Sequence, residues 1–262
     1  MSATLTAPNR ETLMREPRPS LATLTKVELR KAYDTRAGLW LLVTIVGVAL
    51  LALFGTLIFE DDDANKTFRS LLEMLQFLPL GFLLPVLGIL LVTSEWSQRS
   101  ALTTFTLTPN RWRIVAAKAL ALFVLALLSV AVTIVAAAFG AAVGGAPDAW
   151  REAGETIPRV ALFQLINVSV GFAFGFVFLN SPLAIVLYFV IPTAWTILGE
   201  AISALDSAAD WLDLNRTGSA LFPDEGGGVS GEEWAQLATS LGLWLLVPLA
   251  IGMWRLSRAE VK

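Results

Sequence analysis

The side chains that could perform chemistry are few, and their types exclude much of enzymology. The 262-residue chain contains no cysteine and no histidine, which removes thiol nucleophiles, disulfides, Cys/His zinc sites, haem ligation by His or Cys, and His-based acid–base catalysis. None of its lysines follows a glycine, so the motif G-x-x-x-x-G-K-[ST] is absent and the chain is not expected to hydrolyse ATP. We therefore predict a non-catalytic protein without a catalytic residue or a metal site.

The remaining candidates are polar residues inside long apolar runs, where such groups are costly and mark function. They are Glu73, Gln76, Gln164, Asn167 and Glu200. Glu73 and Glu200 fall within about a turn of a predicted membrane boundary, so their carboxylates can reach water. Gln164 and Asn167 are three residues apart and share a helix face, which places them against protein or on a translocation path. Hydrogen bonding to another helix is the favoured role.

The elements that must position these residues are apolar helices. Hydrophobic residues make up 55% of the chain and charged residues 16%, with a mean hydropathy of +0.66, outside the range of ordinary soluble domains. We predict an all-α, polytopic membrane protein whose six-helix transmembrane domain covers residues 38–256. Six runs are long enough to cross a bilayer, near 39–59, 71–93, 114–143, 160–179, 183–204 and 235–254. The third exceeds the thickness of the hydrocarbon core and must tilt or project.

The segments outside the spans are short and polar. Residues 1–19 have little to bury and are predicted to be disordered. Residues 20–37 mix apolar and charged side chains, which predicts an amphipathic helix at the membrane surface with Ser20 as its N-cap; a solvated helix leading into the first span is the alternative. Residues 257–262 form a tail. The longest connection, from about 205 to 234, is predicted to be a loop.

Basic residues are distributed unequally between the two sides of the predicted membrane. With alternating spans, 14 of the 19 Lys and Arg residues fall on the side of the N-terminal segment, which the C-terminus shares. Because positive residues are retained in the cytoplasm, we predict a multi-pass protein of the cell membrane with both termini cytoplasmic.

Prolines and glycines inside the spans carry further predictions. Pro79, Pro85 and Pro192 are expected to kink their helices rather than end them. Gly171 and Gly175 form a G-x-x-x-G face that permits close helix packing. Four phenylalanines of the same span are expected to face lipid, or alternatively an amphiphilic substrate: Phe172, Phe174, Phe176 and Phe178.

The strongest local signal is the connection between the second and third spans, residues 94–120. Taken alone, its basic residues make it a positive-inside loop. The stretch also resembles the ABC-2 type permease family of ABC transporters, whose members carry here a Glu, a small pair such as Gly-Thr, a Leu-rich stretch, Pro-x-Arg and a Lys. Ser-Ala replaces the family's Gly-Thr pair, while the layout of surface helix and six spans agrees with the family. The residues in the matching places are Glu95, Ser100, Ala101, Leu102, Leu107, Pro109, Arg111 and Lys118.

The resemblance implies a transporter subunit coupled to a separate ATPase. In that family this stretch is a coupling helix that fits a groove on the ATPase, which makes Glu95, Arg99, Ser100, Pro109 and Arg111 the candidate coupling residues. The implied partners are two cytoplasmic ABC ATPases, which bind ATP and Mg²⁺, a second identical or related permease chain, and the lipid bilayer. No cofactor bound by this chain and no nucleic acid are expected.

The implied activity is export of an amphiphilic substrate such as a drug, peptide, lipid or glycan by alternating access. The second and fifth spans would lie at the interface between permeases, and the candidate path residues are Gln164, Asn167, Pro79, Pro85 and Pro192. The alternative function is a non-transporting membrane anchor or assembly subunit of another complex, which shares the hydropathy but needs no ATPase.

Overall fold

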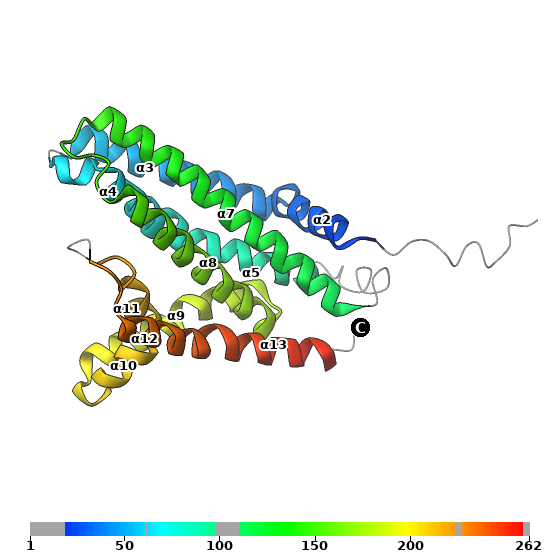
Figure 1. Ribbon diagram of the computed structural model, residues 1–262. Coiled ribbons are helices and arrows are strands. Elements are labelled where there is room, and N and C mark those ends of the chain that lie inside the picture. The colour runs from blue at the N-terminus through cyan, green and yellow to red at the C-terminus, as the bar shows by residue number, and fades with distance from the viewer. Residues whose placement is uncertain (1–18, 61, 98–109, 224–226, 259–262) are drawn as a thin grey trace, which may run out of the picture.

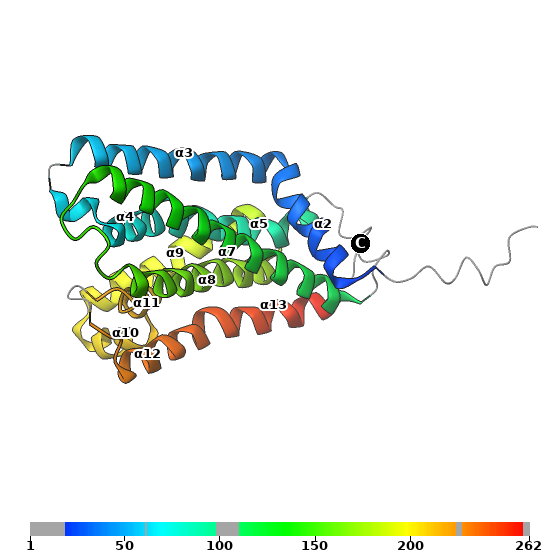
Figure 2. The ribbon, with the colours of Figure 1, turned by 45° about the horizontal axis from the view of Figure 1, so that its top comes forward.

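The computed structural model describes residues 19–60, 62–97, 110–223 and 227–258, and within these ranges the chain is helical without any strand. The predicted all-α fold is confirmed, as expected where apolar segments must satisfy their backbone groups internally. The predicted disordered leader lies outside the described residues except for Pro19. The long helices form an elongated bundle (Figures 1 and 2): α2 (Leu21–Asp34), α3 (Arg36–Phe59), α4 (Phe68–Leu75), α5 (Gly81–Ser97), α7 (Arg111–Gly144), α8 (Ala153–Phe178), α9 (Ser181–Ala201), α12 (Gly231–Leu241) and α13 (Val247–Arg258).

Five helices in the described ranges are long and apolar enough to cross a membrane: α3, α7, α8, α9 and the continuous run from α12 to α13. They correspond to the first, third, fourth, fifth and sixth predicted spans. Helix α7 has 34 residues, or about 51 Å at 1.5 Å per residue. It therefore exceeds a hydrocarbon core of about 30 Å, as its apolar run predicts.

The second predicted span is two helices joined by a π-helical segment, η2 (Gln76–Leu80), and not one regular helix. Backbone angles at both ends of η2 remain helical, so the chain does not break between Phe68 and Ser97. Pro79 lies inside η2, where the wider turn accommodates a ring that would clash with a regular α-helix. Helices α5 and α9 continue through Pro85 and Pro192, which confirms that these prolines do not end them.

Helix α8 is the centre of the bundle. Within its apolar stretch 61% of the residues are buried, against 11% for α3. The G-x-x-x-G face packs against α5 as predicted: a Cβ added at Gly171 would lie 2.5 Å from the Pro85 carbonyl oxygen, and one at Gly175 would lie 3.2 Å from that of Ile89. The two helices therefore approach with almost no side chain between them.

The prediction that the α8 phenylalanines face lipid is wrong. Phe172, Phe174 and Phe176 are only 5%, 4% and 2% exposed, because α5, α7, α9 and α13 surround α8. Phe178 is half-buried. Lipid and a protein interior are equally apolar, so the composition of a span does not reveal which of the two it faces.

The stretch predicted as a loop from 205 to 234 is largely folded. It forms a 3₁₀ turn, η3 (Ser203–Leu205), and two short helices, α10 (Asp206–Leu212) and α11 (Leu214–Ser219), ahead of α12. Leu214 and Leu221 are buried, and the Trp244 indole, in the π-helical segment η4 (Gly242–Leu246), donates to the Leu212 carbonyl at 2.7 Å. Hydropathy over a window of about 20 residues does not detect these helices, because each is only a turn or two long.

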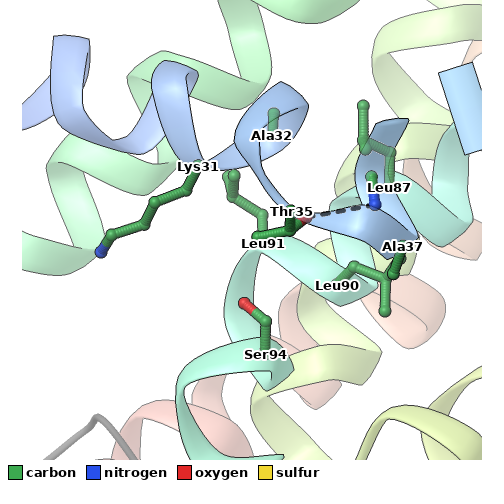
Figure 3. Close-up of a pocket in the computed structure, with 9 residues that line it drawn as sticks. Lys31, Ala32, Thr35, Ala37, Leu87, Leu90, Leu91 and Ser94 are labelled. Carbon is green, nitrogen blue, oxygen red and sulfur yellow. Dashed lines mark hydrogen bonds between the residues drawn. The ribbon is translucent and has the colours of Figure 1, made fainter. Parts of the chain in front are cut away.

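The amphipathic N-terminal helix is α2, and its start and end are set by side-chain caps. Ser20 accepts a hydrogen bond from the Thr23 amide at 3.1 Å, as predicted. The chain bends at Thr35, whose hydroxyl accepts from the Gly38 amide at 3.1 Å. A cavity of about 30 Å³ lies between this bend and α5 (Figure 3); it is large enough for a water molecule but not for an organic ligand.

The two ends of the bundle differ in charge. The start of α2, the start of α7 and the end of α13 lie together at one end, called here the basic end (Figures 1 and 2). The opposite, acidic end holds η1 (Asp63–Lys66), α4, the start of α8 and helices α10 to α12. The chain therefore begins and ends its described part on the same side of the bundle.

Candidate functional site

Four charged residues meet inside the basic end and form what we call the charge network: Glu28 and Lys31 of α2, Glu95 of α5 and Lys118 of α7. The Lys118 ammonium lies 2.7 Å from a Glu28 oxygen and 3.2 Å from a Glu95 oxygen. Lys31 lies 2.7 Å from the other Glu28 oxygen and 2.6 Å from Glu95. Glu28, Glu95 and Lys118 are 4%, 4% and 3% exposed. Three helices are thus joined by buried ion pairs.

The charge network is balanced, with two carboxylates and two ammonium groups. Lys118 also donates to the Leu91 carbonyl at 2.8 Å, so three acceptors surround its ammonium group, the number its three N–H bonds require. Burial by itself would lower the pKa of Lys31, but the carboxylates of Glu95 and Glu28 outweigh it and leave that pKa raised above its ordinary value. Lys31 therefore stays charged at neutral pH, and its stabilising contribution disappears only as the pH rises through that raised pKa.

The coupling residues predicted from the resemblance fall in different places. The Glu95 carboxylate points into the bundle and is held by Lys31 and Lys118. Arg111 donates to the Leu256 carbonyl in the last turn of α13. The other three predicted coupling residues, Arg99, Ser100 and Pro109, lie outside the described residues. Their contact with an ATPase stays a prediction.

Sequence reasoning missed Glu28 and Lys31 as partners of Glu95. Their spacing of three residues on one face of a helix is a signal for an ion pair. A second signal is Lys118 at the edge of a long apolar run, because a lysine at such a depth requires a carboxylate. Neither signal says that the two helices meet at Glu95, since that depends on how they pack.

The predicted path residues separate into two places. Asn167 and Pro192 line one cavity of about 400 Å³, called here the aromatic cavity. It lies between α5, α8, α9 and α11, toward the acidic end. No charged residue of the described chain lines it. Its rings are Phe77, Phe82, Phe163, Tyr188 and Phe189, and its polar side chains are Asn167, Thr193, Asn215 and Ser219.

The other path residues lie outside the aromatic cavity. Gln164 is fully buried and accepts a hydrogen bond from Gln76 of η2, which confirms the predicted hydrogen bond between helices for this residue. Asn167 instead donates to the Phe163 carbonyl of its own helix. Pro79 is buried in η2, and Pro85 packs against Gly171. The structure therefore brings together two of the five predicted residues and assigns the other three to helix packing.

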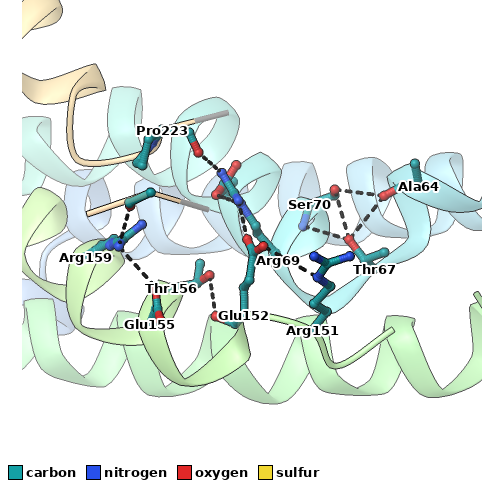
Figure 4. Close-up of polar contacts among 12 residues, drawn as sticks. Ala64, Thr67, Arg69, Ser70, Arg151, Glu152, Glu155, Thr156, Arg159 and Pro223 are labelled. Carbon is teal, nitrogen blue, oxygen red and sulfur yellow. Dashed lines mark hydrogen bonds and ion pairs between the residues drawn. The ribbon is translucent and has the colours of Figure 1, made fainter. Parts of the chain in front are cut away.

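At the acidic end Arg69 of α4 connects three segments (Figure 4). It donates to Glu73 at 2.8 Å, to Glu152 at the start of α8, and to the Pro223 carbonyl at 2.6 Å. The Arg69 side chain is 18% exposed. The Arg69 guanidinium, whose planar fork suits several acceptors at once, thus attaches the chain beyond α11 to the bundle. Arg159 of α8 adds a second attachment, because it donates to the Gly227 carbonyl at 3.0 Å.

Replacing Arg69 with Gln is expected to lower the free energy of unfolding by about 2–3 kcal/mol, because hydrogen bonds to a charged donor are lost and two partly buried carboxylates remain. Thermal unfolding in detergent measures the loss, and hydrogen exchange should show faster opening at 214–223. Arg151→Gln is the matched control. Its side chain is 78% exposed and 3.8 Å from Glu152, so a change of less than about 1 kcal/mol is expected. Equal effects of the two variants would mean that Arg69 does not hold the segment beyond α11 against the bundle.

Comparison with known proteins identifies no family for this chain. The sequence matches no protein-family model, and it matches none of the curated proteins. The likeness to ABC-2 permeases therefore depends on the residues at 94–120 and on the layout of the helices. Function has to be argued from the charge network and the aromatic cavity.

Proposed function

We propose that the chain is the membrane-spanning permease subunit of an ATP-driven ABC transporter, of the ABC-2 type, that exports amphiphilic substrates. It crosses the cell membrane six times, through the five long apolar helices and the combined run α4–η2–α5. Both termini are cytoplasmic. Two observations support this topology: the described part begins and ends at the same end of the bundle (Figure 2), and 14 of 19 basic residues belong to that side.

The charge network is the observation that carries the proposal. The predicted coupling stretch, residues 94–120, includes the connection from α5 to α7. The charge network joins the last turn of α5 to the second turn of α7 and joins both to α2. A force applied to that segment by a moving partner would reach three helices that are tied together, which then shift as one rigid body. Buried ion pairs also join the helices of static bundles, so the test below is what separates the permease from an anchor.

The aromatic cavity supplies the substrate site of the same proposal. It has the volume typical of small-molecule sites, about 300–1,000 Å³, with apolar walls and a few amide and hydroxyl groups. It lies between α5 and α9, which belong to the second and fifth spans. A second permease chain at this interface would complete the path, and ATP binding by two cytoplasmic ATPases would drive alternating access.

The test is co-purification with an ABC ATPase, taken first from any that is encoded beside the gene. The chain and the ATPase are co-expressed, extracted in mild detergent and compared with the variant Glu95→Gln. We expect the wild type and Glu95→Gln both to associate stably with the ATPase. In Glu95→Gln, ATP hydrolysis should no longer depend on the permease. The glutamine amide keeps the shape of the side chain but removes the charge that joins α5 to α2 and α7.

The matched control is Glu73→Gln, a carboxylate of the same span at the acidic end, paired with Arg69. It is expected to leave ATPase coupling intact. Coupling lost equally in both variants would mean that general destabilisation is responsible. If no ABC ATPase associates with the chain, the transporter proposal fails and the role of a membrane anchor is favoured.

A further inference from the structure

We propose that the aromatic cavity binds lipophilic organic cations, molecules with a delocalised or shielded positive charge surrounded by apolar groups. The inference deepens the proposed function by naming a substrate class, and it rests on that function for the claim that the bound cation is exported. Binding itself requires neither ATP nor a partner chain.

The first support is the ring lining. Two sets of rings from different helices line the cavity. Phe82 of α5 and Phe189 of α9 stack with centroids 6.0 Å apart, and Tyr188 lies edge-on to Phe189 at 4.9 Å. Phe77 and Phe163 form a second contact at 4.9 Å. Ring faces carry negative electrostatic potential and attract desolvated cations.

The second support is the orientation of the amides. Asn167 donates through its amide nitrogen to the Phe163 carbonyl at 2.9 Å, and Asn215 donates to the Thr196 hydroxyl at 2.9 Å. In both residues the protein engages one N–H of the amide, and no hydrogen bond within the described residues uses the amide oxygen, so each oxygen is available as an acceptor. Oxygen acceptors complement a positive charge, whereas they offer nothing to an anion.

The third support is the charge of the segment from Glu200 to Glu233, called here the cap, whose helix α11 lines the cavity. The described residues from Glu200 to Glu233 include six acidic residues and one basic residue. Arg216, the basic one, is paired with Asp206 and Asp210 at 2.9 and 2.7 Å. A cation bound in the cavity therefore lies in a field of the favourable sign.

One carboxylate of this cap is also buried. Asp213 is 1% exposed and directly precedes Leu214 and Asn215, both of which line the cavity. One of its oxygens accepts from the Asn215 and Arg216 amides at 2.8 and 3.3 Å. The other has no hydrogen-bond partner in the described part of the chain. A buried carboxylate that is only half satisfied is costly, and a cation in the adjoining cavity would compensate it.

The entrance is accessible from the membrane. Phe77 and Phe82 are 36% and 56% exposed on helices that the proposal places in the bilayer. A lipophilic cation concentrates in that environment before it binds, whereas a hydrophilic cation does not. Small inorganic cations are disfavoured for a second reason, since the lining offers no carboxylate ligand.

The experiment compares two probes that share four phenyl rings and differ in the sign of their charge, tetraphenylphosphonium and tetraphenylborate. Binding isotherms are measured on nanodiscs that contain the full-length chain, with empty nanodiscs subtracted. We expect saturable binding of the phosphonium, and weaker or non-saturable binding of the borate. Equal affinity for the two ions, or no saturable binding of the phosphonium, would overturn the proposal.

Three variants locate the site. Phe189→Leu keeps an apolar side chain but removes the ring, and should weaken phosphonium binding about threefold to tenfold. Asp213→Asn keeps a residue that caps helices well but removes the charge; it should weaken phosphonium binding and leave borate binding unchanged or stronger. Phe139→Leu, a ring that is 53% exposed on α7 and does not line the cavity, is the control and should change neither.

The outcomes separate the two proposals. Association with an ATPase without phosphonium binding would retain the permease and reject this substrate class. Phosphonium binding without any ATPase partner would retain the cation site and reject the ABC transporter. Equal losses in Phe189→Leu and Phe139→Leu would place the bound ion outside the cavity and overturn the site assignment.

Discussion

Replacing Lys118 with Met is expected to lower the free energy of unfolding by about 3–5 kcal/mol, the largest effect among single substitutions at the basic end. Lys118 is 3% exposed and contacts both carboxylates of the charge network. Met fills a similar volume but leaves Glu28 and Glu95 to share the single positive charge of Lys31. Removing one partner of a buried ion pair costs more than the pair itself contributes, because an uncompensated charge remains in a medium of low dielectric constant. Thermal or SDS-induced unfolding of the purified chain measures the loss.

A second substitution tests whether the cost comes from charge or from packing. In Lys118→Met combined with Glu28→Gln, one ammonium and one carboxylate remain, those of Lys31 and Glu95, 2.6 Å apart. The double variant should therefore be more stable than the sum of the single losses predicts. Additive losses would mean that the four charges do not act as a unit. Lys66→Met is the matched control, because Lys66 lies 3.8 Å from an exposed Asp63 and should lose less than about 1 kcal/mol.

Replacing Gly171 with Ala is expected to cost about 2–3 kcal/mol, which is large for a single methyl group. The added Cβ would lie 2.5 Å from the carbonyl oxygen and 3.0 Å from the carbonyl carbon of Pro85. Both atoms belong to the backbone of α5, so no side-chain rotation can relieve the overlap and the helices must separate. Since α5 and α8 both line the aromatic cavity, the same variant should also weaken probe binding there.

Ala substitutions at two other glycines should be less destabilising, in an order set by the space around each glycine. At Gly175 the added Cβ would lie 3.1 Å from the Val92 Cβ, so a smaller loss, of about 1 kcal/mol, is expected. At Gly47 of α3 no atom lies within 4 Å. Ala there should leave stability unchanged or raise it by about 1 kcal/mol, since Ala has the higher helix propensity. Thermal unfolding of the three variants in one detergent ranks them. A different order would contradict the close packing of α5 on α8.

The lengths and compositions of the apolar runs determine where most of the long helices of this protein lie. Helices α3, α7, α8 and α9 coincide with predicted runs to within several residues, because about 20 consecutive apolar residues are stable in a bilayer only as a helix. The Ser20 cap and the G-x-x-x-G face of α8 were also predictable, since each depends on residues close in sequence. The absence of thiol and imidazole chemistry follows from composition alone.

Local signals did not give the shape of the second span or of the segment before α12. A proline in an apolar run is compatible with a kink, a break or a π turn, and the choice made at Pro79 depends on how the helix packs. In the segment 205–234, isolated apolar residues among acidic ones resemble a loop until α9 and α12 provide a surface for Leu214 and Leu221 to be buried against.

The sequence by itself therefore determined the class of fold, the approximate positions of the five long apolar helices, and the unequal distribution of charge between the two ends. Only the tertiary structure decided which polar residues meet: that Glu95 pairs with Lys31, 64 residues away in the chain, and that Asn167 shares a cavity with Pro192 while Gln164 does not. The physical reason is that apolar burial is nonspecific. It brings helices together without specifying their rotation or their neighbours, whereas ion pairs, amide pairs and cavities depend on side-chain geometry that exists only after the helices have packed.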